Sequence, residues 1–119
     1  MNIERVRELI GQGLDRDKTG SYSVQDVLEL VEHRQAELII LKDSVAIWNV
    51  MDKPQARTAH IWIVAGDLDE LESVALPRII DKSRELGATK LTVSGRRGWI
   101  RVLRKYGMEE ASTAGVMDL

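Results

Sequence analysis

The strongest constraint on the fold is a strand, a turn and a helix that follow one another near the C terminus. Residues 90–93 are β-rich, residues 95–99 read Gly-Arg-Arg-Gly-Trp, and residues 99–106 have the apolar spacing of a short amphipathic helix. Gly107 then ends that helix, and an extended segment is expected over 109–119. The C-terminal third is therefore predicted to form a strand–helix–strand unit with a basic turn after its first strand.

Two helices are expected before the first strand. Apolar residues at helical spacing over 2–10 predict the first, and Gly11 and Gly13 are expected to end it. Ser23 is a good N-cap for the second, because Asp26 three residues later forms a variant of the capping box.

Three strands follow the helices. They are expected over residues 36–41, 45–51 and 58–65, with a hairpin turn at 42–44 and a loop at Pro54. Alternation in the third strand predicts Ile61 and Ile63 on one face and His60, Trp62 and Val64 on the other. Three meandering strands of this kind form an antiparallel sheet.

A long helical pattern over residues 68–86 connects the third strand to the fourth. Pro77 lies inside it, so a kink or two helical pieces are expected, and Gly87 is expected to end it. The predicted order is α-α-β-β-β-α-β-α-β. This order predicts an α+β fold with a mixed β-sheet covered by helices.

Size and composition exclude several classes of protein. A chain of 119 residues is expected to form one domain over 1–119, and a net charge of -2 argues against a dedicated nucleic-acid binder. The chain has no cysteine, so it has no disulfide framework and no thiolate nucleophile or metal ligand. No apolar leader segment or membrane span is recognisable, so we expect no secretion by a signal peptide.

The element order resembles that of the GNAT superfamily of N-acetyltransferases, and the resemblance covers nearly the whole chain. The signature of that family is a strand followed by N-x-x-A-x-x-x-Y-x-x-x-G-F, and Gly107 and Met108 stand at its last two positions. Leu103 stands where the family has a tyrosine that often protonates the leaving thiolate, and Arg96 stands at the asparagine position. Tyr106 is nearby but about one turn around the helix. The resemblance thus implies the fold, while two functional positions differ.

A second family motif, the pyrophosphate-binding loop R/Q-x-x-G-x-G/A, precedes the long crossover helix. Its backbone N–H groups and the helix dipole hold the phosphates of coenzyme A. The corresponding residues 67–72 read Asp-Leu-Asp-Glu-Leu-Glu, without glycine or arginine. Carboxylates stabilise a helix N-terminus but repel phosphate. We therefore expect that coenzyme binding has been lost, so that no cofactor is needed, and that acetyl-CoA is the cofactor only if the chain is an enzyme.

Residues 15–26 resemble the calcium loop of an EF-hand. Asp15, Asp17 and Asp26 stand at positions one, three and twelve, and Gly20 stands at position six. The last ligand is Asp instead of the longer Glu, and no second hand is present to pair with this one. A polar turn before a capped helix explains the same residues, so a metal site is the lesser alternative.

Positive charge is concentrated around the last predicted helix. Arg97, Arg101 and Arg104 recur at i, i+4 and i+7 and are expected to share a face, with Arg96 and Lys105 beside them. This face could bind an acidic protein partner, with nucleic acid the less favoured partner, or it could pair with the acids of residues 67–72. In an enzyme, Arg96 and Arg97 would hold the coenzyme.

Other candidate functional residues are few. Trp48 and Trp62 fall on neighbouring strands and are expected to share a face of the sheet. That face would be an interface if the two side chains are exposed, and part of the core if a helix covers them. Trp99 is expected to pack in the core. Neither His33 nor His60 has a partner at the spacing of a catalytic triad or a metal site. The family resemblance implies three candidate catalytic groups, which are His60, Asp67 and Tyr106.

The Gly-Arg-Arg-Gly-Trp turn is similar to that of GNAT-like proteins encoded by phages, including internal virion proteins of short-tailed phages. The resemblance implies a non-catalytic component that contacts other phage or virion proteins, or itself, first in the host cytoplasm and then in the virion. An acetyl-CoA-dependent N-acetyltransferase is the alternative, and a nucleic-acid binder with a basic patch is the third.

Overall fold

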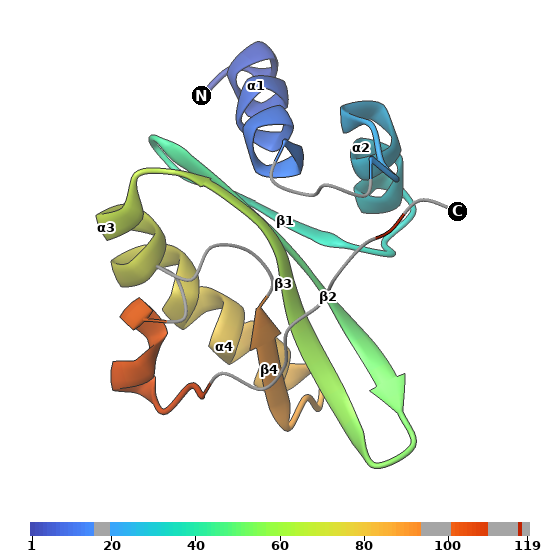
Figure 1. Ribbon diagram of the computed structural model, residues 1–119, viewed down its shortest axis with the longest axis vertical. Coiled ribbons are helices and arrows are strands. Elements are labelled where there is room, and N and C mark those ends of the chain that lie inside the picture. Colours follow the sequence, from blue (N-terminus) through green and yellow to red (C-terminus); the bar gives the residue numbers. More distant parts are fainter. Residues whose placement is uncertain (16–19, 94–100, 110–116, 118–119) are drawn as a thin grey trace.

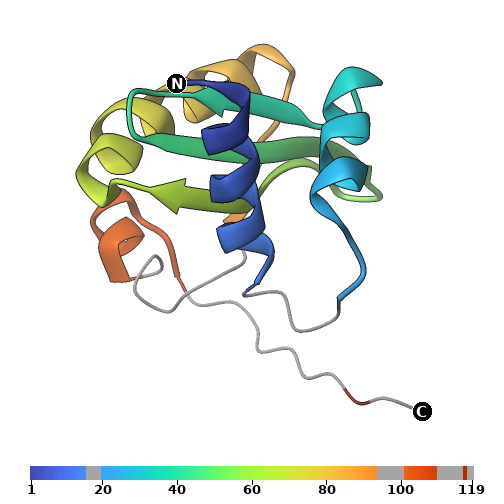
Figure 2. The ribbon, with the colours of Figure 1, turned by 90° about the horizontal axis from the view of Figure 1, so that it is seen from above.

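The computed structural model describes residues 1–15, 20–93, 101–109 and 117. A four-stranded sheet lies between two groups of helices (Figures 1 and 2). Helices α1 (Ile3–Leu14) and α2 (Val24–Glu32) cover one face. A helical crossover and the last short helix cover the other. The predicted α+β class with a mixed sheet is confirmed.

The sheet has the order β1-β2-β3-β4. Strands β1 (Glu37–Ile40), β2 (Ser44–Lys53) and β3 (Ala56–Gly66) form an antiparallel meander. Strand β4 (Lys90–Val93) pairs parallel to β3, because the helical crossover returns the chain to the same end of the sheet. The final strand expected over 109–119 lies almost entirely outside the described residues.

A β-bulge in β3 overturns one sequence expectation. In the register of β2 and β3, Ile47 is opposite Ile63 while Trp48 is opposite Ile61, so Trp62 is an extra residue. The bulge breaks the two-residue alternation. Ile61 consequently faces the helical crossover and Ile63 faces α1, and the prediction that they share a face is wrong.

Helix α1 is longer than the glycines suggested. It begins after Asn2, whose side chain accepts a hydrogen bond from the N–H of Arg5, and it continues through Gly11 and Gly13 to Leu14. A Cβ on Gly13 would collide with Ile63 of β3. Gly13 therefore allows close packing of the helix on the sheet, and the prediction that the two glycines end the helix is wrong.

The capping box predicted for α2 is confirmed. The Ser23 hydroxyl accepts a hydrogen bond from the N–H of Asp26 at 3.1 Å, and the Asp26 carboxylate accepts one from the N–H of Ser23 at 2.8 Å. These bonds lower the pKa of Asp26. The reciprocal pair satisfies two backbone donors at the helix start, so the sequence alone locates this helix.

The crossover helix is divided, as Pro77 predicts. It consists of α3 (Leu68–Glu70), a π-helical turn η1 (Leu71–Ala75) and α4 (Leu76–Glu85). Pro77 has no N–H to donate to the preceding turn, and just before it the N–H of Leu76 bonds to the carbonyl of Leu71, five residues back. The helix ends at Gly87, which has φ = 85°.

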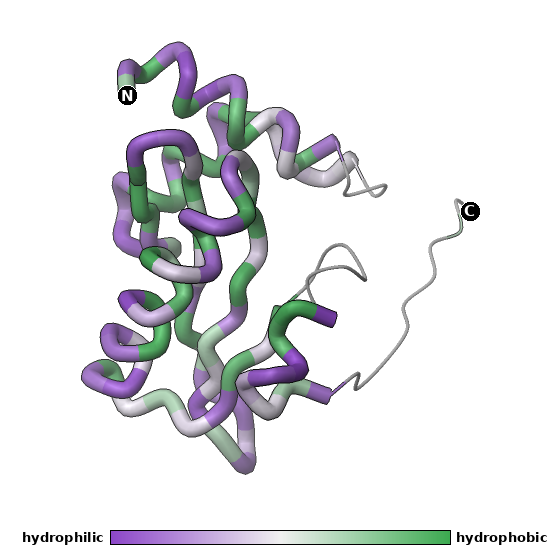
Figure 3. Tube along the Cα trace, turned by 90° about the vertical axis from the view of Figure 1, so that its left-hand side faces the viewer, coloured by the Kyte–Doolittle hydropathy of each residue, from purple (hydrophilic) through white to green (hydrophobic). Residues whose placement is uncertain are grey.

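Each face of the sheet has its own hydrophobic core. Apolar residues recur along the helices and strands (Figure 3). The α1–α2 core contains Val6, Leu9, Ile10, Val27, Ala36, Val45, Ile47, Ile63 and Ala65. The crossover core contains Ala46, Trp48, Ala59, Ile61, Leu71, Ala75, Leu76, Ile79 and Leu103. The bulge in β3 determines which core each of its side chains joins.

Candidate functional site

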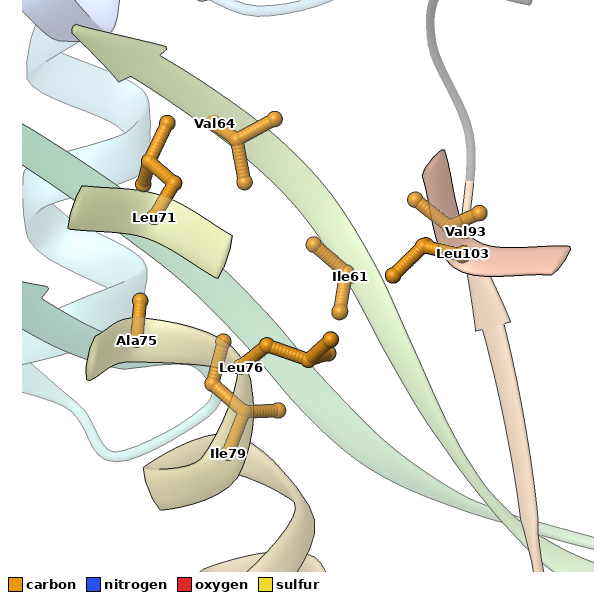
Figure 4. Close-up of a pocket in the computed structure, with 8 residues that line it drawn as sticks. All are labelled: Ile61, Val64, Leu71, Ala75, Leu76, Ile79, Val93 and Leu103. Atoms are coloured by element: carbon orange, nitrogen blue, oxygen red, sulfur yellow. The ribbon is translucent and has the colours of Figure 1, made fainter. Parts of the chain in front are cut away.

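An apolar pocket lies where β3 and β4 meet the helical crossover (Figure 4). The described pairing of the two strands ends at Ile61 and Val93, while β3 continues to Gly66. Side chains from both strands, from the crossover and from the last helix line the pocket: Ile61, Val64, Leu71, Ala75, Leu76, Ile79, Val93 and Leu103. The lining is apolar core, and it offers no polar group to a phosphate.

The start of the crossover follows β3 almost directly. Asp67 alone separates Gly66, the end of β3, from Leu68, the start of α3. The Asp67 carboxylate caps this helix by accepting a hydrogen bond from the N–H of Glu70 at 3.0 Å. Asp67 therefore has a role in folding that explains it without catalysis.

The Glu70 carboxylate near the start of the crossover also bonds within the chain. Glu70 accepts hydrogen bonds from the N–H of Asp43 at 2.9 Å and from the hydroxyl of the fully buried Ser44. It thereby joins the helix to the turn between β1 and β2. The expected acidic helix start is thus present, and its carboxylates occupy the region where backbone donors would have to hold a polyanion.

Glu72 joins the crossover to the last helix. Its carboxylate pairs with Lys105 and accepts a hydrogen bond from the Tyr106 hydroxyl at 3.4 Å. The bond to Glu72 raises the pKa of Lys105. Pairing of the basic cluster with the acids of residues 67–72 is therefore confirmed for Lys105. Tyr106 also bonds to this carboxylate and is about half exposed.

Of the other basic residues near the last helix, the structure describes Arg101 and Arg104. Arg101 and Arg104 are exposed, whereas Leu103 is buried against the apolar pocket at the position of the family's tyrosine. Arg96, Arg97 and Trp99 lie outside the described residues, so their proposed contacts stay predictions. Arg104 begins a 3₁₀ turn, η2 (Arg104–Tyr106), which Gly107 ends with φ = 90°.

A polar row crosses the opposite face of the sheet. His60 of β3 lies between Asn49 of β2 and Thr92 of β4 in the strand register. A ring nitrogen of His60 is 2.7 Å from the Thr92 hydroxyl. Burial of the ring, with the nearby charge of Lys53, lowers the pKa of His60. The lowered pKa favours the neutral form of the imidazole.

Asn49 is a polar residue that sequence reasoning missed. Its Oδ1 atom is buried and has no hydrogen-bond partner in the described part of the chain. Strand alternation places Asn49 on the same face as His60, but the register that makes them neighbours cannot be read from spacing alone. Buried polar atoms in proteins are nearly always hydrogen-bonded, so this acceptor is an exception.

The two tryptophans of the sheet face opposite sides. Trp48 is 3% exposed in the crossover core, whereas Trp62 packs beside the α1–α2 core. The prediction that they share a face is wrong, because the register pairs Trp48 with Ile61 and leaves Trp62 in the bulge. Trp62 contacts the exposed ring of Tyr22 edge to face, with centroids 4.8 Å apart.

The described structure adds no support for a calcium site at residues 15–26. Asp26 serves the capping box, Asp15 ends α1, and Asp17 lies outside the described residues. Within residues 1–15, 20–93 and 101–109, no three His, Cys, Asp or Glu side chains cluster to hold a metal ion. No described helix is long and apolar enough to cross a membrane.

No protein-family model and no curated protein matches this sequence. Solved structures do match its fold. An acetyltransferase from Trypanosoma brucei has 15% identity and a TM-score of 0.66, over 98% of this chain and 92% of that one. Glucosamine-6-phosphate N-acetyltransferase from Arabidopsis thaliana has 13% identity and a TM-score of 0.64, over 99% and 94%.

A third similar structure is a predicted acetyltransferase from Clostridium acetobutylicum with acetyl-CoA. It has 16% identity and a TM-score of 0.63, over 96% of this chain and 84% of that one. At these identities the similarity concerns the arrangement of the chain. The element order, the mixed sheet and these matches agree, and the chain has the fold of the GNAT acetyltransferases.

Proposed function

We propose that this chain is an acetyl-CoA-dependent N-acetyltransferase that binds the phosphates of the coenzyme away from the start of α3. The shared fold over nearly the whole chain supports the reaction class. The observation that carries the proposal is His60, which lies in the central strand β3, two residues before the Trp62 bulge, with a lowered pKa and a hydrogen bond to Thr92. An acyl transfer to an amine needs a neutral base of this kind.

The proposed reaction is direct transfer. The amine nitrogen of the acceptor forms a bond to the thioester carbonyl carbon, the carbon–sulfur bond breaks, and the sulfur leaves as a thiolate. The His60 imidazole takes the proton that the amine loses. Backbone amides at the end of β3, after Trp62, would polarise the carbonyl. Leu103 cannot supply a proton to the thiolate, so solvent would supply it.

The position of the coenzyme phosphates is the unusual part of the proposal. The carboxylates of Asp67, Glu70 and Glu72 do not fit a pyrophosphate at the start of the crossover. The proposal therefore assigns the phosphates to Arg96 and Arg97. Arginine suits this task because its planar guanidinium binds phosphate oxygens in pairs.

Calorimetric titration with acetyl-CoA tests the proposal, with coenzyme A as the second ligand. We expect one-to-one binding, and we expect the double variant Arg96→Ala/Arg97→Ala to lose both binding and turnover. Arg78→Ala, a removal of an exposed arginine on α4, is the matched control. Unchanged turnover in the double variant would reject the phosphate assignment, and an absence of heat at high concentration would reject the enzyme.

The acids of the crossover favour a second candidate function. Because they bond to Ser44, Lys105 and other parts of the chain, they stabilise the fold at the place where a coenzyme site would be. A GNAT-fold protein without coenzyme would act through contacts with virion proteins, as the phage-like turn at 95–99 suggests. Absence of acetyl-CoA binding, together with detection of the chain in purified phage particles by mass spectrometry, would favour this function.

A further inference from the structure

One face of the sheet beyond α1 and α2 carries aromatic, polar and cationic side chains that lie close together and are partly or fully exposed. We call it the β3 patch, and it comprises Tyr22, Lys53, His60, Trp62, Lys90 and Thr92. Tyr22 is 47% exposed, and both lysines and Thr92 are exposed as well. His60 and Trp62 are partly buried between these groups. The patch thus offers aromatic, polar and cationic groups on one accessible surface.

The strand register gives the patch an order. His60 is opposite Thr92, and two residues before it Thr58 is opposite Lys90. Trp62 lies two residues after His60 on the same face, which corresponds to about 7 Å along a strand. The aromatic end and the cationic end therefore lie on opposite sides of His60.

Each end selects a different chemical group. The edge-to-face pair of Trp62 and Tyr22 presents ring surface that binds an aromatic or large apolar group. Lys53 ends β2 and lies on the same face as Asn49 by strand alternation, and Lys90 adds a second positive charge. The cationic end consequently attracts a carboxylate.

We propose that the β3 patch binds a free aromatic amino acid, with its α-amine beside His60. The side chain lies on Trp62 and Tyr22, and the carboxylate lies toward Lys53 and Lys90. The role of this ligand as the acetyl acceptor rests on the proposed function, whereas its binding does not. Asn49 is opposite His60 in the strand register, and its buried Oδ1 atom has no hydrogen-bond partner in the described part of the chain.

Nuclear magnetic resonance of the ¹⁵N-labelled protein tests the binding without any coenzyme. The indole N–H signal of Trp62, assigned by its loss in Trp62→Phe, is followed during titration with L-phenylalanine, L-phenylalaninamide and L-alanine. We expect phenylalanine to bind about 2- to 12-fold more tightly than alanine, from the aromatic contact. We expect it to bind about 1.5- to 5-fold more tightly than the amide, from the carboxylate.

Variants separate the two ends of the patch. Tyr22→Ala should weaken phenylalanine binding while leaving alanine binding unchanged, and Lys53→Gln/Lys90→Gln should abolish the preference for phenylalanine over its amide. Ile40→Ala, at a residue of equal exposure on β1, is the control and should change neither. Equal affinity for the three ligands, or an unmoved Trp62 signal, would overturn the proposal. Loss of acetyl-CoA binding alone would reject the enzyme and leave this binding site standing.

Discussion

The two faces of the sheet use their polar side chains in different ways. On the crossover side, the carboxylates of Asp67, Glu70 and Glu72 each bond to another part of the chain. On the α1 side, the buried Oδ1 of Asn49 has no partner within the described residues, and the neighbouring His60 has a lowered pKa and bonds to Thr92. Carboxylates on the first face join the crossover to other elements, whereas the second face contains a buried polar atom without a described partner.

This difference shows how a fold can be retained while a site within it changes. A helix start that binds phosphate needs unoccupied backbone donors and little negative charge. The chain instead places side-chain acceptors at that helix start, and these stabilise the junction of β3, the β1–β2 turn and the crossover. The proposed function therefore relies on His60 on the other face of the sheet and on Arg96 and Arg97.

The largest effect is expected at the junction on the crossover side. Gly66 has φ = 118°, and a Cβ there would collide with the carbonyl oxygen of Asp43 and the backbone of Ser44. Because backbone cannot move away, Gly66→Ala should lower the free energy of unfolding by about 3 kcal/mol or more, measured by urea denaturation. Gly107→Ala, at φ = 90° with open space around it, should cost about 1 kcal/mol. Equal losses would show that the junction is not tightly packed.

A smaller effect is expected when the acid that holds this junction is removed. Glu70→Ala leaves the buried Ser44 hydroxyl and the Asp43 N–H without their acceptor. The loss should be about 1–3 kcal/mol in thermal or urea unfolding. Glu70→Gln keeps an amide oxygen at the same place and should lose less. If both variants were as stable as the parent chain, the carboxylate would have no structural role.

Conservative core changes test the assignment of β3 residues to the two faces. Ile61→Val and Ile63→Val should each cost about 0.5–1.5 kcal/mol. In a double-mutant cycle, the losses in unfolding free energy from Ile63→Val and from Leu9→Ala in α1 should not add, because both side chains belong to the α1–α2 core. The losses from Ile61→Val and Leu9→Ala should add to within about 0.5 kcal/mol. Coupling of Ile61 with Leu9 would contradict the bulge.

The smallest effect is a dependence of stability on pH that comes from His60. Its pKa is lower in the folded chain than in the unfolded one, so the unfolded state binds more protons between the two values. The contribution of His60 to the free energy of unfolding is therefore fully present above about pH 6.5, and it is lost as the pH falls through the pKa of the folded state. His60→Gln should flatten the rise of unfolding free energy between pH 5 and 7.5. An unchanged slope would show that the ring is not held neutral.

Local signals in the sequence located most elements correctly. Ser23 and Asp26 are close enough in the chain to determine their capping box, and Gly87 and Gly107 end their helices by adopting positive φ. Pro77 divides the crossover because a missing N–H acts within one turn. Such features depend only on neighbours along the chain, so the amino-acid pattern is sufficient to predict them.

The glycines of α1 show where prediction from local sequence fails. Gly11 and Gly13 look like a helix end, yet α1 continues through both because Gly13 packs closely on Ile63. The cost of glycine within a helix, about 1 kcal/mol, is offset by packing against the sheet. A contact between residues 50 positions apart leaves no local trace, so only the assembled structure reveals it.

The sequence by itself determined the order of the described elements, the mixed sheet and the acidic start of the crossover. These follow from periodicity, capping residues and charge. Tertiary structure decided which face each β3 side chain occupies, because one extra residue at Trp62 reverses the alternation. It also brought Asn49, His60 and Thr92 into one row from three strands. Strand register depends on how whole faces are buried, and no short segment carries that information.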